Sequence, residues 1–179
     1  VLDEYYQKRM DLKLTGRTLF GAMAPKGQEL EDHYFGSLKR KVAAFMKDLD
    51  EELWKYGIPS KTKHNEVAPA QHEVACVYAK MNITTDNNHL LMNIMQDVAK
   101  KHGLRCLLHE KPFAGVNGSG KHDNFSIIAN TGLNLFNPGN DPLHNIPFLA
   151  ALACTIKGVD EYADLLRMSI ASAGNDHRL

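Results

Sequence analysis

Residues 61–79 read KTKHNEVAPAQHEVACVYA, and this stretch carries the clearest strand pattern in the chain. Within it, the run 71–79 alternates between two sets of side chains with the two-residue period of a β-strand. The run 61–68 is also extended in character, and only Pro69 and Ala70 separate the two runs. We therefore predict a β-hairpin whose loop consists of Pro69 and Ala70.

Amphipathic helices are predicted on both sides of this hairpin. From about residue 37 to 56, apolar residues recur at three- and four-residue steps while charged residues fill the other face. A second helix is predicted from about 86 to 102, with Thr84 or Thr85 as its N-cap. A third helix is predicted from about 147 to 171. The hairpin therefore lies between the first two helices along the chain.

The rest of the chain shows weaker patterns. Gly158 lowers the helix propensity near the middle of the third helix and marks a candidate break. Residues 104–109 and 122–128 are further strand candidates, separated by a glycine-rich loop at 115–120. Strands and helices are interspersed without a βαβ rhythm, so we predict an α+β fold with a largely antiparallel sheet and helices packed against one face.

The composition excludes several classes of protein. The 179 residues include 21 basic and 21 acidic side chains, and this zero net charge argues against binding of nucleic acid through counterion release. No apolar run approaches the ~20 residues that span a bilayer. Cys76, Cys106 and Cys154 form no CxxC pair, so neither a disulfide scaffold nor a structural zinc site is indicated. We expect a cytoplasmic protein, and because both ends look cut, a segment of a longer polypeptide.

The predicted hairpin brings two carboxylates together. If its loop is Pro69 and Ala70, the register places Glu66 opposite Glu73, with Cβ atoms about 5 Å apart. Like charges directly opposed are destabilising unless a shared proton or a bound cation compensates them. Magnesium and manganese prefer such oxygen ligands. Pro-Ala is a poor loop for the favoured hairpin turns, and the alternative is that both glutamates are exposed on a solvated strand pair.

A second motif, GVNGSGKH at 115–122, almost matches the phosphate-binding pattern GxxxxGK followed by Ser or Thr. His122 occupies the last position and lacks the required hydroxyl, and a strand rather than a helix is predicted after it. A P-loop is therefore not indicated. The glycines still allow the backbone and Asn117 to approach a ligand closely, and His122 could ligate a metal. The alternative is a plain glycine turn with a surface histidine.

Together these two motifs resemble the glutamine synthetase family, and longer stretches of the sequence resemble its type III branch. The stretch HNEVAPAQHE at 64–73 resembles the family's metal-site motif, and KPFAGVNGSGKH at 111–122 resembles its glutamate- and metal-binding motif. The segments PKGQELEDHYFG at 25–36 and AGNDHRL at 173–179 look specific to the type III branch. The resemblance covers essentially the whole chain.

The resemblance implies an enzyme that ligates ammonia to L-glutamate with ATP, through a γ-glutamyl phosphate intermediate, to give L-glutamine, ADP and phosphate. It implies a curved, half-barrel-like antiparallel sheet with helices on its outer face, and two or three Mg²⁺ or Mn²⁺ ions per site. Residues 1–179 would be part of the catalytic domain, without the N-terminal domain and the C-terminal part of the catalytic domain. The full-length protein would form a homo-oligomeric ring with active sites between subunits, and the segment alone would be inactive.

Site residues follow from the resemblance by position. Glu66 and Glu73 would ligate the metal nearer the glutamate, and His122 would bind the metal nearer the ATP phosphates. Asn117 and the backbone of Gly118 would hold the amino-acid end of glutamate.

The resemblance also implies contacts to the phosphate and the nucleotide. Arg178 would be catalytic and would bind the α-carboxylate of glutamate or the transferring phosphate. Many family members carry a histidine where this chain has Asn124. The residues that would line the nucleotide pocket are Cys76, Val77, Tyr78, Asn124 and Ser126.

Two alternatives to this function remain open at this point. One is a γ-glutamyl ligase that acts on an amine other than ammonia. The other is a non-catalytic relative that binds nucleotide or serves as a structural ring subunit.

Overall fold

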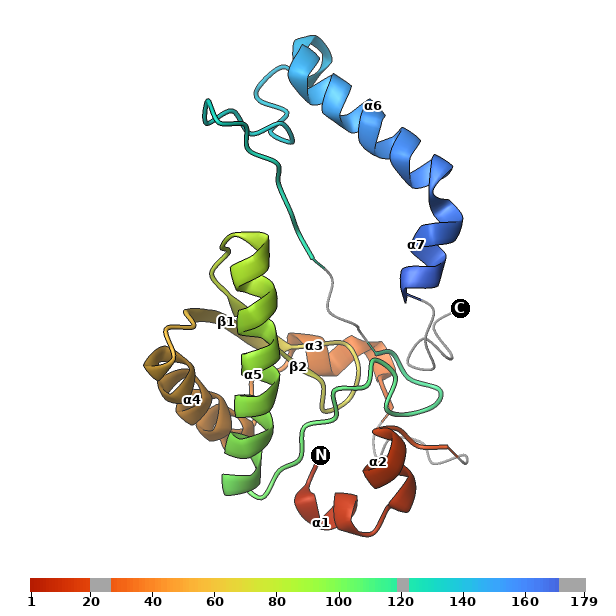
Figure 1. Ribbon diagram of the computed structural model, residues 1–179. Helices are drawn as coiled ribbons and strands as arrows, with labels where there is room; N and C mark the ends of the chain where they lie inside the picture. The colour runs from red at the N-terminus through yellow and green to blue at the C-terminus, as the bar shows by residue number, and fades with distance from the viewer. Residues whose placement is uncertain (20–26, 119–122, 171–179) are drawn as a thin grey trace. The chain divides into compact units, whose positions relative to one another are not determined.

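The computed structural model describes residues 1–19, 27–118 and 123–170, apart from the side chains of Thr62 and Ile170 (Figure 1). The described residues belong to two compact units, one up to residue 118 and one from 123 to 170. The first unit contains α1 (Asp3–Gln7), α2 (Met10–Thr15), the 3₁₀ turn η1 (Glu29–Glu31), α3 (Asp32–Phe35), α4 (Arg40–Lys55), β1 (Ser60–Asn65), β2 (His72–Cys76) and α5 (Met81–Lys101). The second contains the 3₁₀ turn η2 (Pro142–His144), α6 (Ile146–Glu161) and α7 (Ala163–Ile170).

The predicted α+β class and antiparallel pairing are confirmed. Strands β1 and β2 form a two-stranded antiparallel sheet. The strands predicted at 104–109 and 122–128 are wrong for the described residues, which form only the isolated bridges Leu2–Leu104 and Ile128–Asn134 there. A strand needs a neighbour to satisfy its backbone groups, and a single bridge supplies that pairing at one position only.

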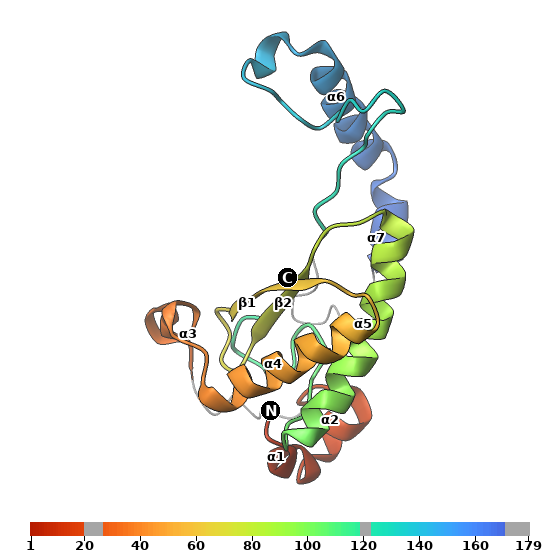
Figure 2. The ribbon, with the colours of Figure 1, turned by 90° about the vertical axis from the view of Figure 1, so that its left-hand side faces the viewer.

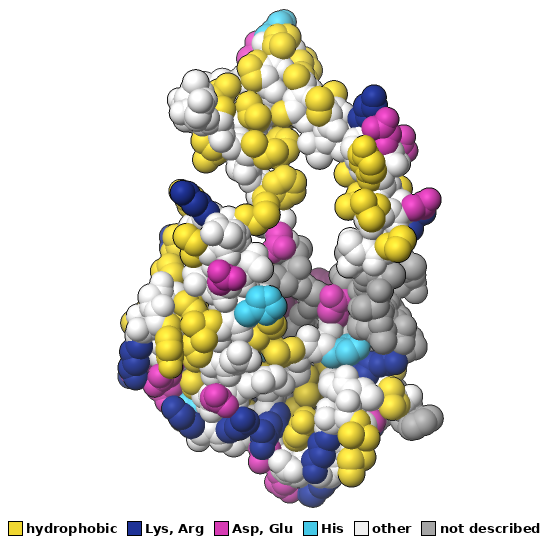
Figure 3. All heavy atoms as spheres, in the orientation of Figure 1, with side chains coloured by type: hydrophobic (Ala, Val, Ile, Leu, Met, Phe, Trp, Pro, Cys, Tyr) yellow, Lys and Arg dark blue, Asp and Glu magenta, His cyan; other side chains and the backbone are white. Residues whose placement is uncertain are grey.

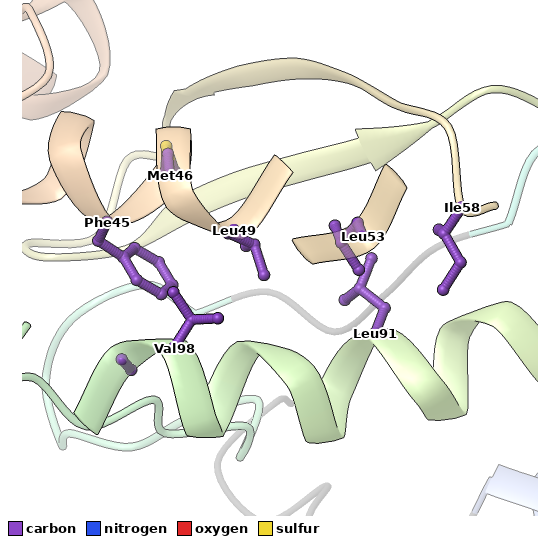
Figure 4. Packing of buried hydrophobic residues seen from close by; sticks show 8 residues of the cluster. Phe45, Met46, Leu49, Leu53, Ile58, Leu91 and Val98 are labelled. Atoms are coloured by element: carbon purple, nitrogen blue, oxygen red, sulfur yellow. The ribbon is translucent and has the colours of Figure 1, made fainter. Parts of the chain in front are cut away.

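The core of the first unit lies between α4 and α5, which run side by side in Figures 1 and 2. Figure 4 shows the buried side chains that the two helices share. Val74 and Cys76 of β2 pack against this cluster, so the helices cover the face of the hairpin that carries these two residues. The residues that form the cluster are Phe45, Met46, Leu49, Leu53, Ile58, Leu91, Val98 and Ala99.

Helix α4 confirms the first predicted helix, whereas α5 begins five residues earlier than predicted. Thr84 and Thr85 lie inside α5, and the hydroxyl of Thr85 donates to the carbonyl of Met81 at 2.9 Å. The N-cap prediction was therefore wrong, because a threonine hydroxyl can also bond back to the preceding turn of a helix. Lys80 precedes the first turn without a side-chain cap.

The third predicted helix is present as two helices, α6 and α7. Asn145 caps α6, because its side-chain oxygen accepts a hydrogen bond from the N–H of Phe148 at 3.2 Å. The break falls at Tyr162 rather than at Gly158, whose carbonyl accepts from the N–H of Tyr162 at 3.0 Å and so remains within the helical pattern.

Helices α6 and α7 expose much of their apolar surface, as the yellow side chains along them in Figure 3 show. Helix α6 buries none of its residues within the described chain. In the described ranges, no helix is both long enough and apolar enough to cross a membrane.

Candidate functional site

The turn of the hairpin is built around Pro69 and Ala70, as predicted. The carbonyl of Ala68 accepts a hydrogen bond from the N–H of Gln71 at 3.1 Å. Ala70 has a φ of +58°, and a proline followed by a residue with positive φ is the pattern of a type II turn. The tight hairpins that continue directly into paired strands use type I′ or II′ turns, whose first central residue has a positive φ that proline cannot adopt.

The predicted register is therefore wrong by two residues. Glu73 pairs with His64 rather than with Glu66, and the N–H of Glu66 donates to the carbonyl of Gln71 at 3.0 Å. Val67, which lies between Glu66 and the turn that begins at Ala68, belongs to neither strand. A slip of two residues preserves which face each side chain occupies, whereas a slip of one residue would reverse it. Glu66 and Glu73 thus remain on one face as diagonal neighbours.

His64 joins the two glutamates on this face. Its Nε2 lies 2.5 Å from Oε2 of Glu73 and 3.8 Å from Oε1 of Glu66. One ligand atom from each of the three residues lies within 4.8 Å of the others. The side chains are 38%, 24% and 37% exposed for His64, Glu66 and Glu73, so the cluster is open to solvent on one side and shielded on the other.

The imidazole of His64 is held by a second contact. Its Nδ1 lies 2.8 Å from the backbone carbonyl of Asn65, and because a carbonyl only accepts, Nδ1 carries the proton and Nε2 faces the carboxylates. The hydrogen bond to Asn65 raises the pKa of His64 above its ordinary value, and the negative charges of Glu73 and Glu66 raise it further. Protonated His64 therefore offsets part of the repulsion between the two carboxylates.

The donor set of this cluster fits a hard divalent cation. Carboxylate oxygens are the preferred ligands of Mg²⁺ and Mn²⁺, and a histidine oriented by a backbone carbonyl is a common additional ligand. The neighbouring Lys63 does not compete for this position, because it pairs with Asp50 of α4 on the opposite face of the hairpin. A divalent cation would take over the charge balance that a proton on His64 supplies.

His72 lies on the face away from the glutamates, because it pairs with Asn65 and is adjacent in β2 to Glu73. Its Nδ1 lies 2.8 Å from the side-chain oxygen of Asn65, and its ring is 5.2 Å from the ring of His33. Burial lowers the pKa of His72 to about 4, with a further contribution from the charge of His33. His72 is therefore neutral at pH 7 and donates its Nδ1 proton to Asn65.

The glycine loop lies beside a cavity of about 280 Å³, which is lined in part by Asn117 and Lys111. The N–H of Asn117 donates to Oε1 of Gln28 at 2.7 Å, and Nζ of Lys111 lies 3.4 Å from the carbonyl of Val116. At Gly118 a Cβ atom would lie 2.0 Å from the backbone oxygen of Glu110, so this position accommodates only glycine without rearrangement.

The nucleotide residues implied by the resemblance lie in both units. Cys76 packs against the core cluster, whereas Tyr78 is 93% exposed and Val77 is partly exposed. Asn124 and Ser126 belong to the second unit and are exposed there. The assignment of these five residues to a nucleotide pocket stays a prediction.

Two of the implied site residues, His122 and Arg178, lie outside the described residues, and their roles stay predictions. Two polar residues beside the proposed site were missed. His64 could have been found from its position two residues before Glu66, since residues at this spacing share a face of a strand. No local signal in the sequence connects Gln28 to Asn117, which lies 89 positions later.

Comparison with known proteins identifies relatives along nearly the whole chain. Residues 8–172 match the family model described as the catalytic domain of glutamine synthetase. A glutamine synthetase of Butyrivibrio fibrisolvens is 65% identical over 98% of this chain, one of Bacteroides fragilis 53% over 97%, and a type-3 glutamine synthetase of Dictyostelium discoideum 51% over 98%. The chain spans about a quarter of the length of these relatives, namely 25%, 24% and 24%. It belongs to the glutamine synthetase family, within the catalytic domain, and resembles the type III branch.

Proposed function

We propose that the full-length protein containing this chain ligates ammonia to L-glutamate, with ATP as the source of energy. The γ-carboxylate of glutamate would first be phosphorylated, and ammonia would then displace phosphate from γ-glutamyl phosphate to give L-glutamine. The observation that carries this proposal is the convergence of His64, Glu66 and Glu73 in a stretch that falls within the family match. The chain spans about a quarter of the length of its relatives, so we do not expect it to turn over in isolation.

The proposed chemistry depends mainly on positioning and on neutralising charge. Divalent cations, when bound, neutralise the phosphoryl group and the carboxylate that accepts it. Glu66 and Glu73 supply two negative charges at the place where such a cation is needed, and His64 Nε2 completes the donor set. His122 would hold a second cation, with Mg²⁺ or Mn²⁺ and two or three ions per site as the expected complement.

The remaining residues would orient the substrates. Asn117 and the backbone of Gly118 line or adjoin the 280 Å³ cavity and offer polar groups to the amino-acid end of glutamate. Arg178 would neutralise the α-carboxylate or the transferring phosphate. The proposed nucleotide contacts are Cys76, Val77, Tyr78, Asn124 and Ser126.

The full-length protein is also proposed to form a homo-oligomeric ring with active sites between subunits, and to work in the cytoplasm. Both proposals extend from the family resemblance to the larger protein.

The test is γ-glutamyl hydroxamate formation by the full-length protein from glutamate, ATP and hydroxylamine. We expect Glu66→Ala and Glu73→Ala to abolish product formation, because each removes a charged ligand from the cluster. Glu51→Ala is the matched control, since Glu51 is an exposed glutamate of α4 that pairs with Lys47 across one turn. Activity that survives both cluster substitutions would overturn the metal assignment.

Phosphate release then separates the proposed reaction from its alternatives. Ammonia-dependent release with glutamate supports a glutamine synthetase, whereas release that requires a larger amine identifies a different γ-glutamyl ligase. Binding of ATP without release under either condition would identify a non-catalytic relative.

A further inference from the structure

A short segment at residues 27–36, which we term the strap, contacts both parts of the proposed site. It comprises the residues from Gly27 through η1 and α3 to Gly36. One end of the strap bonds to the glycine loop, and the other end bonds to the hairpin that carries Glu66 and Glu73. The two bonding regions of the chain are separated from the strap by about 30 and 90 residues, so these are long-range contacts and not local turns.

The hairpin end of the strap holds the backbone next to the carboxylates. Nδ1 of His33 lies 2.7 Å from the carbonyl oxygen of Glu66 itself. A carbonyl oxygen only accepts, so His33 donates from Nδ1. The ring of Tyr34 meets the ring of His64 edge-on, with centroids 6.0 Å apart. The strap therefore touches two of the three residues in the cluster.

Asn65 links the strap to the hairpin through its buried side-chain amide. It is 3% exposed, and its side-chain nitrogen donates to the carbonyl of Gly36 at 2.9 Å while its oxygen accepts from Nδ1 of His72. If the strap moves away, the buried amide nitrogen loses the carbonyl of Gly36 and is left without this acceptor. Asn65 lies between His64 and Glu66, so its fixed position constrains both neighbours.

The other end of the strap holds the glycine loop. Oε1 of Gln28 accepts the backbone N–H of Asn117 at 2.7 Å, beside the cavity that both residues line. The backbone between the two attachments is strained, because Leu30 and Glu31 have φ values of +53° and +52°. Residues other than glycine rarely adopt this region, and such a conformation persists where contacts on both sides hold it.

We propose that the strap is a positioning element for catalysis, in which His33 aligns the metal-binding hairpin and Gln28 aligns the glutamate-binding loop. The inference rests on the proposed function, and it adds two positioning residues, each of which acts through a hydrogen bond to the backbone of the proposed site. It predicts that the two ends of the strap affect different steps, since one end bonds to the carboxylate hairpin and the other to the substrate loop.

The first test is Mn²⁺ binding to the full-length protein, measured by electron paramagnetic resonance without substrates. Residues that orient metal ligands typically contribute 10- to 100-fold to metal affinity, so we expect His33→Ala to weaken binding by about 10-fold or more. His33→Asn keeps a donor at the position of Nδ1 and is expected to restore most of the affinity. His102→Ala is the control, because it removes a histidine hydrogen bond to Asp48 between α4 and α5.

The second test is the Michaelis constant for glutamate in the hydroxamate assay. Gln28→Ala removes the acceptor for the Asn117 N–H, and a single hydrogen bond of this kind corresponds to a change of roughly fivefold. We expect the KM for glutamate to rise by that factor while the KM for ATP stays unchanged. Gln28→Glu keeps an acceptor oxygen and is expected to restore the KM for glutamate.

These experiments separate failure of the strap from failure of the proposed function. If wild-type protein binds no Mn²⁺, or Glu66→Gln binds it equally well, the proposed metal site is wrong. If Glu66→Gln loses Mn²⁺ but His33→Ala binds it like wild type, the role of His33 is wrong while the function stands. If His33→Ala does not fold, Gln28→Ala still tests the strap: an unchanged KM for glutamate in this variant would overturn the role of Gln28.

Discussion

Gly118 in the glycine loop has no room for a larger residue, so a substitution there is expected to displace the loop. Alanine at this position would place Cβ 2.0 Å from the backbone oxygen of Glu110 and 3.0 Å from Cδ of Lys111. The lysine side chain can swing away, but the backbone oxygen cannot, so the loop must move by about 1 Å to reach an acceptable contact distance. A misplacement of ~1 Å in a substrate-positioning group costs on the order of 100-fold in rate, or about 2.7 kcal/mol.

We therefore expect Gly118→Ala to lower kcat/KM for glutamate by about 100-fold in the hydroxamate assay. Gly158→Ala is the matched control, because a Cβ at Gly158 meets no atom within 4 Å and the residue lies inside α6. That substitution is expected to leave activity unchanged and to favour the helix by up to ~1 kcal/mol. A Gly118→Ala enzyme with wild-type kcat/KM for glutamate would refute the placement of this loop beside the substrate.

Two further predictions concern stability, measured as the unfolding midpoint of the full-length protein. Leu49→Ala leaves a cavity at a fully buried position between α4 and α5, and should lower the free energy of unfolding in urea by about 2–5 kcal/mol per subunit. A decrease of less than about 1 kcal/mol would show that this core does not support the fold. Hydrogen bonds from Arg9, and then from the backbone N–H groups of Leu19 and Leu12, hold the pKa of Asp11 well below its ordinary value. Its stabilising effect is therefore fully present above the ordinary pKa and is lost as the pH falls from there through the lowered pKa. The thermal midpoints of wild type and Asp11→Asn should differ most at about pH 6, and the difference should shrink below the ordinary pKa; a difference that grows towards low pH would contradict this assignment.

The faces of the hairpin could be predicted from the sequence, but its register could not. Alternation places Glu66 and Glu73 on the same side for any register that differs by an even number of residues. The register itself depends on the turn, and the type II pattern at Pro69 and Ala70 shifts the pairing by two residues. The same even-numbered rule places His64 on this face, where the structure pairs it with Glu73.

The presence of the helices could likewise be predicted from the sequence, but their exact ends could not. The period of the apolar residues correctly predicts α4 and most of α5, since burial against each other sets which face is apolar. The N-terminal end of α5 was not predicted correctly, because the hydroxyl of Thr85 bonds back into its own helix instead of capping it. The strap contacts could not be predicted at all, since the bond between Gln28 and Asn117 depends on how distant segments pack.

The central claim is that His64, Glu66 and Glu73 converge to hold a divalent cation. The most direct measurement is anomalous diffraction from crystals of the full-length protein grown with Mn²⁺. We predict an anomalous peak within coordination distance, about 2.0–2.6 Å, of carboxylate oxygens from both Glu66 and Glu73. A saturating Mn²⁺ concentration that leaves His64 bonded to Glu73 with no peak between the two carboxylates would contradict it.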